Sequence, residues 1–192
     1  MDMKKTKPGK NKKRKDSIIE EWVLVPGIPD VDESSLEGAG ELIDVDSELK
    51  GFETAAEKSG KELEVTTIRA LDIDENEKPY CIRIAPGTKE EKHEAIFRKA
   101  QGIDNRFKAT KLLALLAFQG HDGGQEMLAF RFHVGIGVMP DLDIAIYWCK
   151  RAAQAGNTYA KQNLCSLLEE AIEHYPERKE LIEELKCLRK LS

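Results

Sequence analysis

The chain has 192 residues, a formal net charge of −5 and 34% charged residues. That length fits one domain, or one domain with a tail, and the high charged share predicts that part of the chain stays unfolded. No run approaches the ~20 apolar residues of a membrane span, and the basic N-terminus lacks the apolar core of a signal peptide. The four cysteines form no C-x-x-C pair, so we expect reduced thiols and an intracellular protein, cytoplasmic or nuclear.

Residues 4–15, KKTKPGKNKKRK, are almost all basic or turn-forming. A solvated, disordered tail explains them, and the alternatives are a nuclear localisation signal or loose binding to nucleic acid or anionic lipid. No aromatic residue interleaves with the lysines, and the acidic residues that follow would compete with phosphate for them. The basic residues make a nuclear or nucleic-acid-associated factor the alternative function. Because of the acidic residues, we expect a protein partner rather than nucleic acid.

Residues 16–62 are acidic and rich in Ser, Gly and Pro, so residues 1–62 are predicted to form one disordered tail. One short motif in it, EEWVLV, contains Glu20, Glu21, Trp22 and Val25. It resembles the docking peptides that bind ubiquitin-like autophagy modifiers, in which an extended segment adds a strand to a sheet edge and fills two pockets. Packing of Trp22 onto the folded part is the competing interpretation, and a chance match is the third.

Residues 63–87 change to a β pattern. EVTTIRALDI alternates, DENEK is typical of a turn, and PYCIRIA alternates again. The pattern predicts a β-hairpin. Because a lone hairpin is marginal in water, we expect it to pack on the first helices as a cap.

Residues 88–192 are predicted to form a helical domain. Thr88 and Glu91 make a capping box that opens a helix ending near Gly102. The stretch 124–156 then contains two apolar-periodic segments, separated by a glycine-rich turn, with Asp141 as the N-cap of the second.

Two further helices complete the domain. Residues 158–174 repeat the first apolar segment, and Pro176 opens a capping helix over 176–191 whose charged face would keep the end of the domain in solution.

The second segment of 124–156 has an earlier copy. Shifted back by 36 residues, it lays Trp148 on Leu112 and Gly156 on Gly120. A self-match at this period in helix pairs predicts an α-solenoid. The expected fold is mainly α: a short α-α superhelix of about two helix pairs plus the capping helix.

The repeat also carries a family resemblance. Its residues are Leu128-Ala129, Gly135-x-Gly137-Val138, Asp141, Ala145, Trp148, Ala152-Ala153, Gly156 and Ala160. They resemble the Sel-1-like repeat, a relative of the tetratricopeptide repeat, with one copy matching over 124–156 and a degenerate copy upstream. The resemblance implies a scaffold that organises complexes in quality control, signalling or host–pathogen contact.

Candidate catalytic and metal-binding residues are not grouped. Gly135 and Gly137 follow a helix and precede Pro140, which argues against a dinucleotide fingerprint. The histidines lie on different helices without ligand spacing, and no cysteine has an adjacent base. We therefore expect a non-catalytic adaptor without cofactor or metal, and an enzyme whose site is assembled across repeats is a rival hypothesis.

The expected adaptor surface is a groove lined by the first helix of each pair. Helical phase suggests Gln125 and Arg131 on one such helix, and Lys161 and Asn163 on the next, as partner-binding residues. Trp148 is expected in the core. Because solenoids generally need about three units to bury a continuous core, a homodimer or a protein partner lying along the groove would supply the missing burial.

Overall fold

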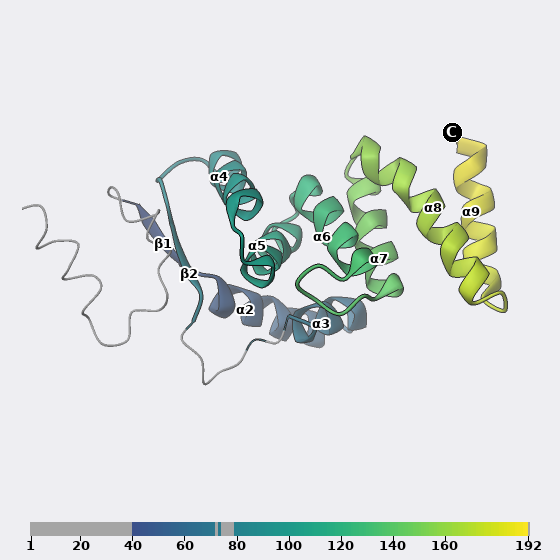
Figure 1. Ribbon diagram of the computed structural model, residues 1–192, viewed down its shortest axis with the longest axis horizontal. Coiled ribbons are helices and arrows are strands. Elements are labelled where there is room, and N and C mark those ends of the chain that lie inside the picture. Colours follow the sequence, from purple (N-terminus) through teal and green to yellow (C-terminus); the bar gives the residue numbers. More distant parts are fainter. Residues whose placement is uncertain (1–39, 72, 74–78, 192) are drawn as a thin grey trace, which may run out of the picture.

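The computed structural model describes residues 40–71, 73 and 79–191, and this part of the chain is mainly helical (Figure 1). The helices in it are α2 (Val45–Lys58), α3 (Glu62–Arg69), α4 (Lys89–Gly102), α5 (Arg106–Phe118), α6 (Asp122–Val134), α7 (Leu142–Gln154), α8 (Thr158–His174) and α9 (Lys179–Leu191). Strands β1 (Glu41–Asp44) and β2 (Cys81–Ile84) form a two-stranded antiparallel sheet. The predicted fold class, mainly α with a β-hairpin near the N-terminus, is confirmed, although the two strands come partly from other residues than expected.

Helices α4 to α9 stack in chain order, each packed against the next (Figure 1). The segments around Met127 and Trp148 fold back on one another as α6 and α7, and α5 lies alongside α6. Helix α5 is buried over Ala109–Ala117 because α4, α6 and α2 all pack against it. Its sequence is accordingly apolar on nearly every side, as expected of an enclosed helix.

Equivalent helix starts recur at the spacing of the predicted repeat. Asn105 and Asp141 cap α5 and α7, and His121 and Asn157 cap α6 and α8; each side chain accepts a hydrogen bond from the backbone N–H three residues on. Satisfying these N–H groups fixes where each helix begins. The arrangement is compatible with a helical repeat.

The structure moves the predicted tail boundary. Residues 40–62 were expected to be disordered, yet they form β1, α2 and the start of α3. Asp44 caps α2 by accepting from Ser47 N at 3.0 Å, and Val45 and Leu49 are fully buried. An apolar stripe therefore outweighs the acidic composition of this segment once a surface is present to bury it. Residues 1–39 lie outside the described residues.

Of the hairpin predicted over 63–87, only the second strand is present. Residues 62–69 form α3, and β2 pairs with β1 instead, with Glu41 opposite Ile84. Val65 and Ile68 are buried, so the alternation that suggested a strand also provides a helical contact face. Strand preference depends on context, and here β1 supplies the partner strand.

The remaining boundaries differ little from the expected ones. The capping box of Thr88 and Glu91 is present at the start of α4. The final helix begins at Lys179 rather than 176. Within the described ranges, none of the helices combines the length and apolar character that crossing a bilayer requires.

Candidate functional site

One face of the stack is covered by α2 and α3, which pack against α5 and α7 (Figure 1). Phe52 stacks on Phe118 with ring centroids 5.3 Å apart. The indole Nε1 of Trp148, which is fully buried as expected, donates to Thr67 Oγ1 at 3.0 Å. Helices α5 and α7, the second helices of the pairs α4–α5 and α6–α7, are therefore closed to a partner on this side.

Polar contacts anchor the same cover. Lys111 Nζ lies 2.8 Å from Asp46 Oδ1, and both side chains are buried. Glu64 is also buried and accepts from Tyr147 Oη at 2.6 Å and from Arg151. Each carboxylate buried here has a cationic partner, so removing that cation would leave its charge incompletely compensated, which is costly.

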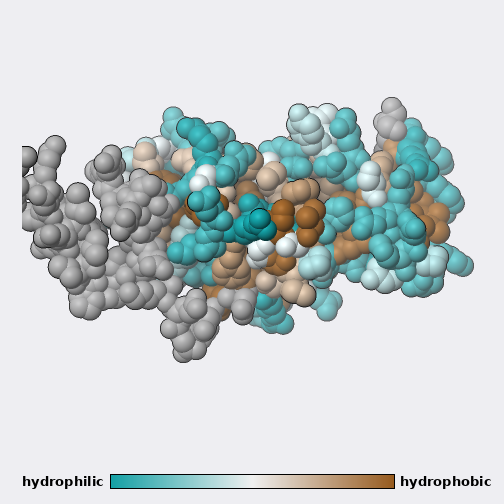
Figure 2. All heavy atoms as spheres, viewed as in Figure 1, coloured by the Kyte–Doolittle hydropathy of each residue, from teal (hydrophilic) through white to brown (hydrophobic). Residues whose placement is uncertain are grey.

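A groove of about 240 Å³ lies between α6 and α8, the first helices of successive pairs, with Cys149 of α7 at its floor. Its lining residues are Glu126, Ala129, Phe130 and His133 of α6, Cys149 of α7, and Asn163, Ser166, Leu167 and Glu170 of α8. Phe130 is 45% exposed. In the view of Figure 2, apolar residues reach the surface over the middle of the stack, between hydrophilic regions.

The charged residues that line the groove are acidic, apart from one histidine. His133 Nε2 lies 2.7 Å from Glu170 Oε2, which ties α6 to α8 at one end of the groove. Glu126 is contacted by the amide Nδ2 of Asn163 at 3.5 Å, a long separation for a hydrogen bond. Burial raises the pKa of Glu126, because its charge is incompletely solvated.

Cys149 lies on the floor of the groove and is not set up as a nucleophile. Its thiol donates to the Ala160 carbonyl at 3.2 Å. Burial, with smaller contributions from Glu126 and Cys165, raises its pKa to about 12. The reactive thiolate is therefore scarce at neutral pH, and this residue contributes packing.

Only one of the four residues expected along the groove lines it. Asn163 lines it, and Lys161 is exposed on α8 but outside it. Gln125 is buried, and its Nε2 donates to the Ala117 carbonyl at 3.1 Å, so it holds α6 to α5. Its expected place in the groove is wrong.

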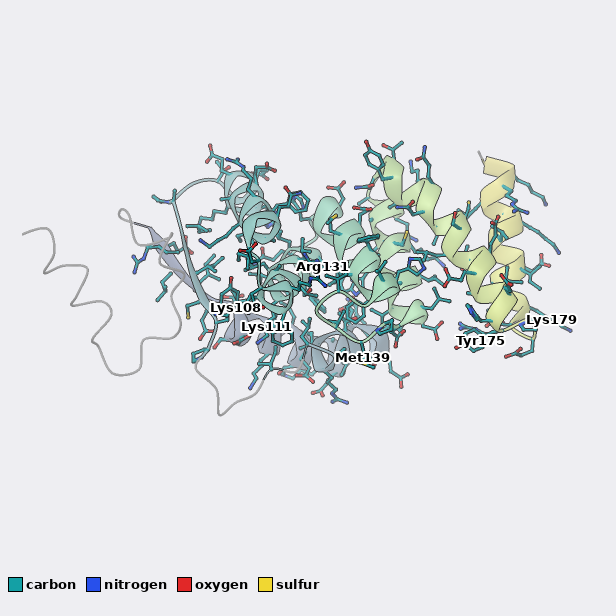
Figure 3. The ribbon with its side chains drawn as sticks, in the orientation of Figure 1. Lys108, Lys111, Arg131, Met139, Tyr175 and Lys179 are labelled. Carbon is teal, nitrogen blue, oxygen red and sulfur yellow. The ribbon has the colours of Figure 1, made fainter. Side chains whose placement is uncertain are left out.

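Arg131 also faces away from the groove. Its Nη1 donates to the Arg106 carbonyl and to Thr110 Oγ1, both at 2.9 Å. Figure 3 shows this side chain lying toward α5. The guanidinium thus closes the interface between α5 and α6 and is not a groove contact. The expected motif residues Glu20, Glu21, Trp22 and Val25 lie outside the described residues.

Sequence reasoning missed every charged or aromatic residue of the groove: Glu126, Phe130, His133 and Glu170. A signal for them was present. Residues 126, 130 and 133 lie on one helical face, and both Asn163 and Glu170 follow their α6 partners at nearly one repeat spacing.

A second hollow, of about 350 Å³, lies between β1, α2 and α4. Its charges are mixed, and Lys92 already pairs with Glu41 across it. Burial lowers the pKa of His93, with His121 and Lys89 adding to the effect and Gln119 and Glu90 opposing it. Among the described residues, no group of three or more His, Cys, Asp or Glu side chains is placed to hold a metal ion.

Comparisons with known proteins found no family model, no curated protein and no solved structure that matches this chain.

Proposed function

We propose that this chain is a non-catalytic adaptor that binds a peptide segment of a partner protein in the groove between α6 and α8. The observation that carries the proposal is the half-exposed Phe130 in a concave site lined by α6 and α8. Mostly apolar, concave sites with a few polar groups are the usual places where ligands bind. Covering the exposed part of Phe130 would contribute about 1 kcal/mol from its area alone.

The asymmetry of the two faces supports the same proposal. Helices α2 and α3 already occupy the side formed by α5 and α7, whereas the α6–α8 groove has walls and a floor but no occupant among the described residues. The resemblance to Sel-1-like and tetratricopeptide repeats belongs to the proposal as well, and it implies a role in organising complexes.

The tail motif EEWVLV is a separate part of the proposal. It would dock a ubiquitin-like autophagy modifier through Trp22 and Val25 by strand addition. The basic residues 4–15 support the alternative, a nuclear or nucleic-acid-associated factor, which predicts a steep dependence of binding on salt.

The test is a quantitative pull-down from cell lysate with the full chain as bait. The bait variants are wild type, Phe130→Ser and the matched control Tyr159→Ser. Tyr159 is an aromatic residue of α8 that is 72% exposed and lies outside the groove. We expect Phe130→Ser to lose specific partners at least tenfold, and Tyr159→Ser to keep them.

Equal recovery by Phe130→Ser and wild type, with matching thermal midpoints, would exclude the groove as the binding site. A further bait, Trp22→Ala with Val25→Ala, separates the tail from the groove. Equal recovery of ubiquitin-like modifiers by this bait and by wild type would remove the docking motif from the proposal.

A further inference from the structure

We infer that the α6–α8 groove is specific for a partner peptide in which a lysine or arginine lies two positions from an apolar residue. The cation would lie against Glu126, and the apolar side chain would cover Phe130. This inference rests on the proposed peptide-binding function and names the class of partner that the groove fits.

The charge of the lining residues gives the first argument. The groove contains two carboxylates, Glu126 and Glu170, and its lining includes neither lysine nor arginine. The basic residues expected there from the sequence are not in the lining: Arg131 donates to the Arg106 carbonyl, and Lys161 is exposed outside the groove. Electrostatic complementarity therefore favours a cationic ligand and opposes an acidic one.

Glu126 is the carboxylate that lacks a cation. Glu170 has His133 at 2.7 Å, whereas no basic side chain in the described part of the chain forms an ion pair with Glu126. A partly desolvated carboxylate without a counter-charge is costly, and an incoming guanidinium or ammonium would offset that cost with a charge-assisted hydrogen bond. The raised pKa of Glu126 has the same origin, since burial is its cause.

The spacing along α6 sets the pattern of the ligand. Glu126 and Phe130 are separated by one helical turn, a rise of about 6 Å. In an extended peptide, side chains on the same side repeat every two residues, or about 6.7 Å. A basic residue and an apolar residue two positions apart therefore reach both sites at once.

The test is selection from a phage-displayed library of random ten-residue peptides against the immobilised full chain. We expect wild type to enrich peptides with Lys or Arg two positions from Leu, Ile, Val, Met or Phe by tenfold or more over the input. Glu126→Gln should lose the basic preference and keep the apolar one. The control Glu173→Gln, an exposed glutamate of α8 outside the groove, should keep both preferences.

Enriched peptides without a basic preference, or a basic preference that survives Glu126→Gln, would overturn the inference. If wild type enriches peptides without a basic preference and Phe130→Ser abolishes their enrichment, the proposed peptide-binding function remains and only the partner class is wrong. If no peptide is enriched by any bait, both proposals fail together.

A further bait tests whether the basic residues 4–15 of the chain itself, and not a partner, occupy the groove. It is the full chain with every lysine and arginine in 4–15 replaced by serine. Enrichment by this bait but not by wild type would identify the tail as the occupant and would overturn the inference of a partner peptide.

Discussion

The hydrogen bond from Trp148 to Thr67 offers a quantitative test of how α3 docks on α7. Thr67→Val keeps the shape of the side chain but removes the oxygen that accepts from the indole Nε1 at 3.0 Å. Trp148 is fully buried, so its N–H would have no water to replace the lost partner. Leaving a buried donor unsatisfied costs about 1–3 kcal/mol of unfolding free energy. For a chain of this size the thermal midpoint should fall by roughly 2–12 °C.

Thr66 provides a matched control on the same helix. It is exposed, and its hydroxyl donates to the Glu62 carbonyl, as the hydroxyl of Thr67 donates to Leu63. Thr66→Val should therefore change stability by no more than about 0.5 kcal/mol. The assay is urea denaturation followed by far-UV circular dichroism, with the free energy extrapolated to water. Equal stabilities for the two variants would refute the docking of α3 against α7.

Three further changes have defined outcomes. Gly51→Ala should raise the unfolding free energy by about 0.5–1 kcal/mol, because the glycine lies within α2 with open space around it. Gly156→Ala should lower the unfolding free energy by about 1–2 kcal/mol, because the φ of this glycine is +104°. Urea denaturation of both variants checks the contrast. Lys111→Met should cost about 3–5 kcal/mol by leaving the buried Asp46 carboxylate without its cation, and a loss below 1 kcal/mol would contradict that pairing. Burial raises the pKa of Glu126 above its ordinary 4.5, so the native state loses stability as the pH rises through the raised value; Glu126→Gln should therefore match wild type in thermal midpoint at pH 4 and exceed it at pH 7.

The paired helices were predictable because their signals are local. Caps such as Asn105 and Asp141 act within three residues of their own position, and glycines at helix ends recur with them. Periodicity and capping are properties of short segments, so a single sequence reveals them. The same holds for the capping box at Thr88.

The first two described helices were missed because their support comes from distant residues. Asp46 forms an ion pair with Lys111 and accepts from the backbone N–H of Tyr80, and Glu64 accepts from Tyr147 and Arg151. None of these pairings can be inferred from the residues that neighbour Asp46 or Glu64 in the sequence. The acidic composition of the α2 segment therefore pointed to disorder, and the alternation in the α3 segment pointed to a strand. Tertiary contacts reversed both expectations.

The groove was only partly predictable because α6 is apolar on more than one side. Phe130 and Phe132 lie two residues apart, yet Phe132 is fully buried while Phe130 is 45% exposed. Because both residues are aromatic, the helical period alone does not show which of them faces inward. The predicted groove face therefore contained Gln125 and Arg131, which point toward α5, and lacked their neighbours on the groove side.

The cover formed by α2 and α3 changes how the stack should open. In a simple repeat array each unit holds only its neighbours, and the ends loosen first. Here the cover straps α5 and α7 together, so the earlier helices should exchange their amide hydrogens as one slow block. Helices α8 and α9 pack chiefly on α7 and on each other, so we expect their amide hydrogens to exchange faster. One wall of the groove thus belongs to the slow block and the other to the helices expected to exchange faster, so a ligand that spans both walls should slow amide exchange in α8.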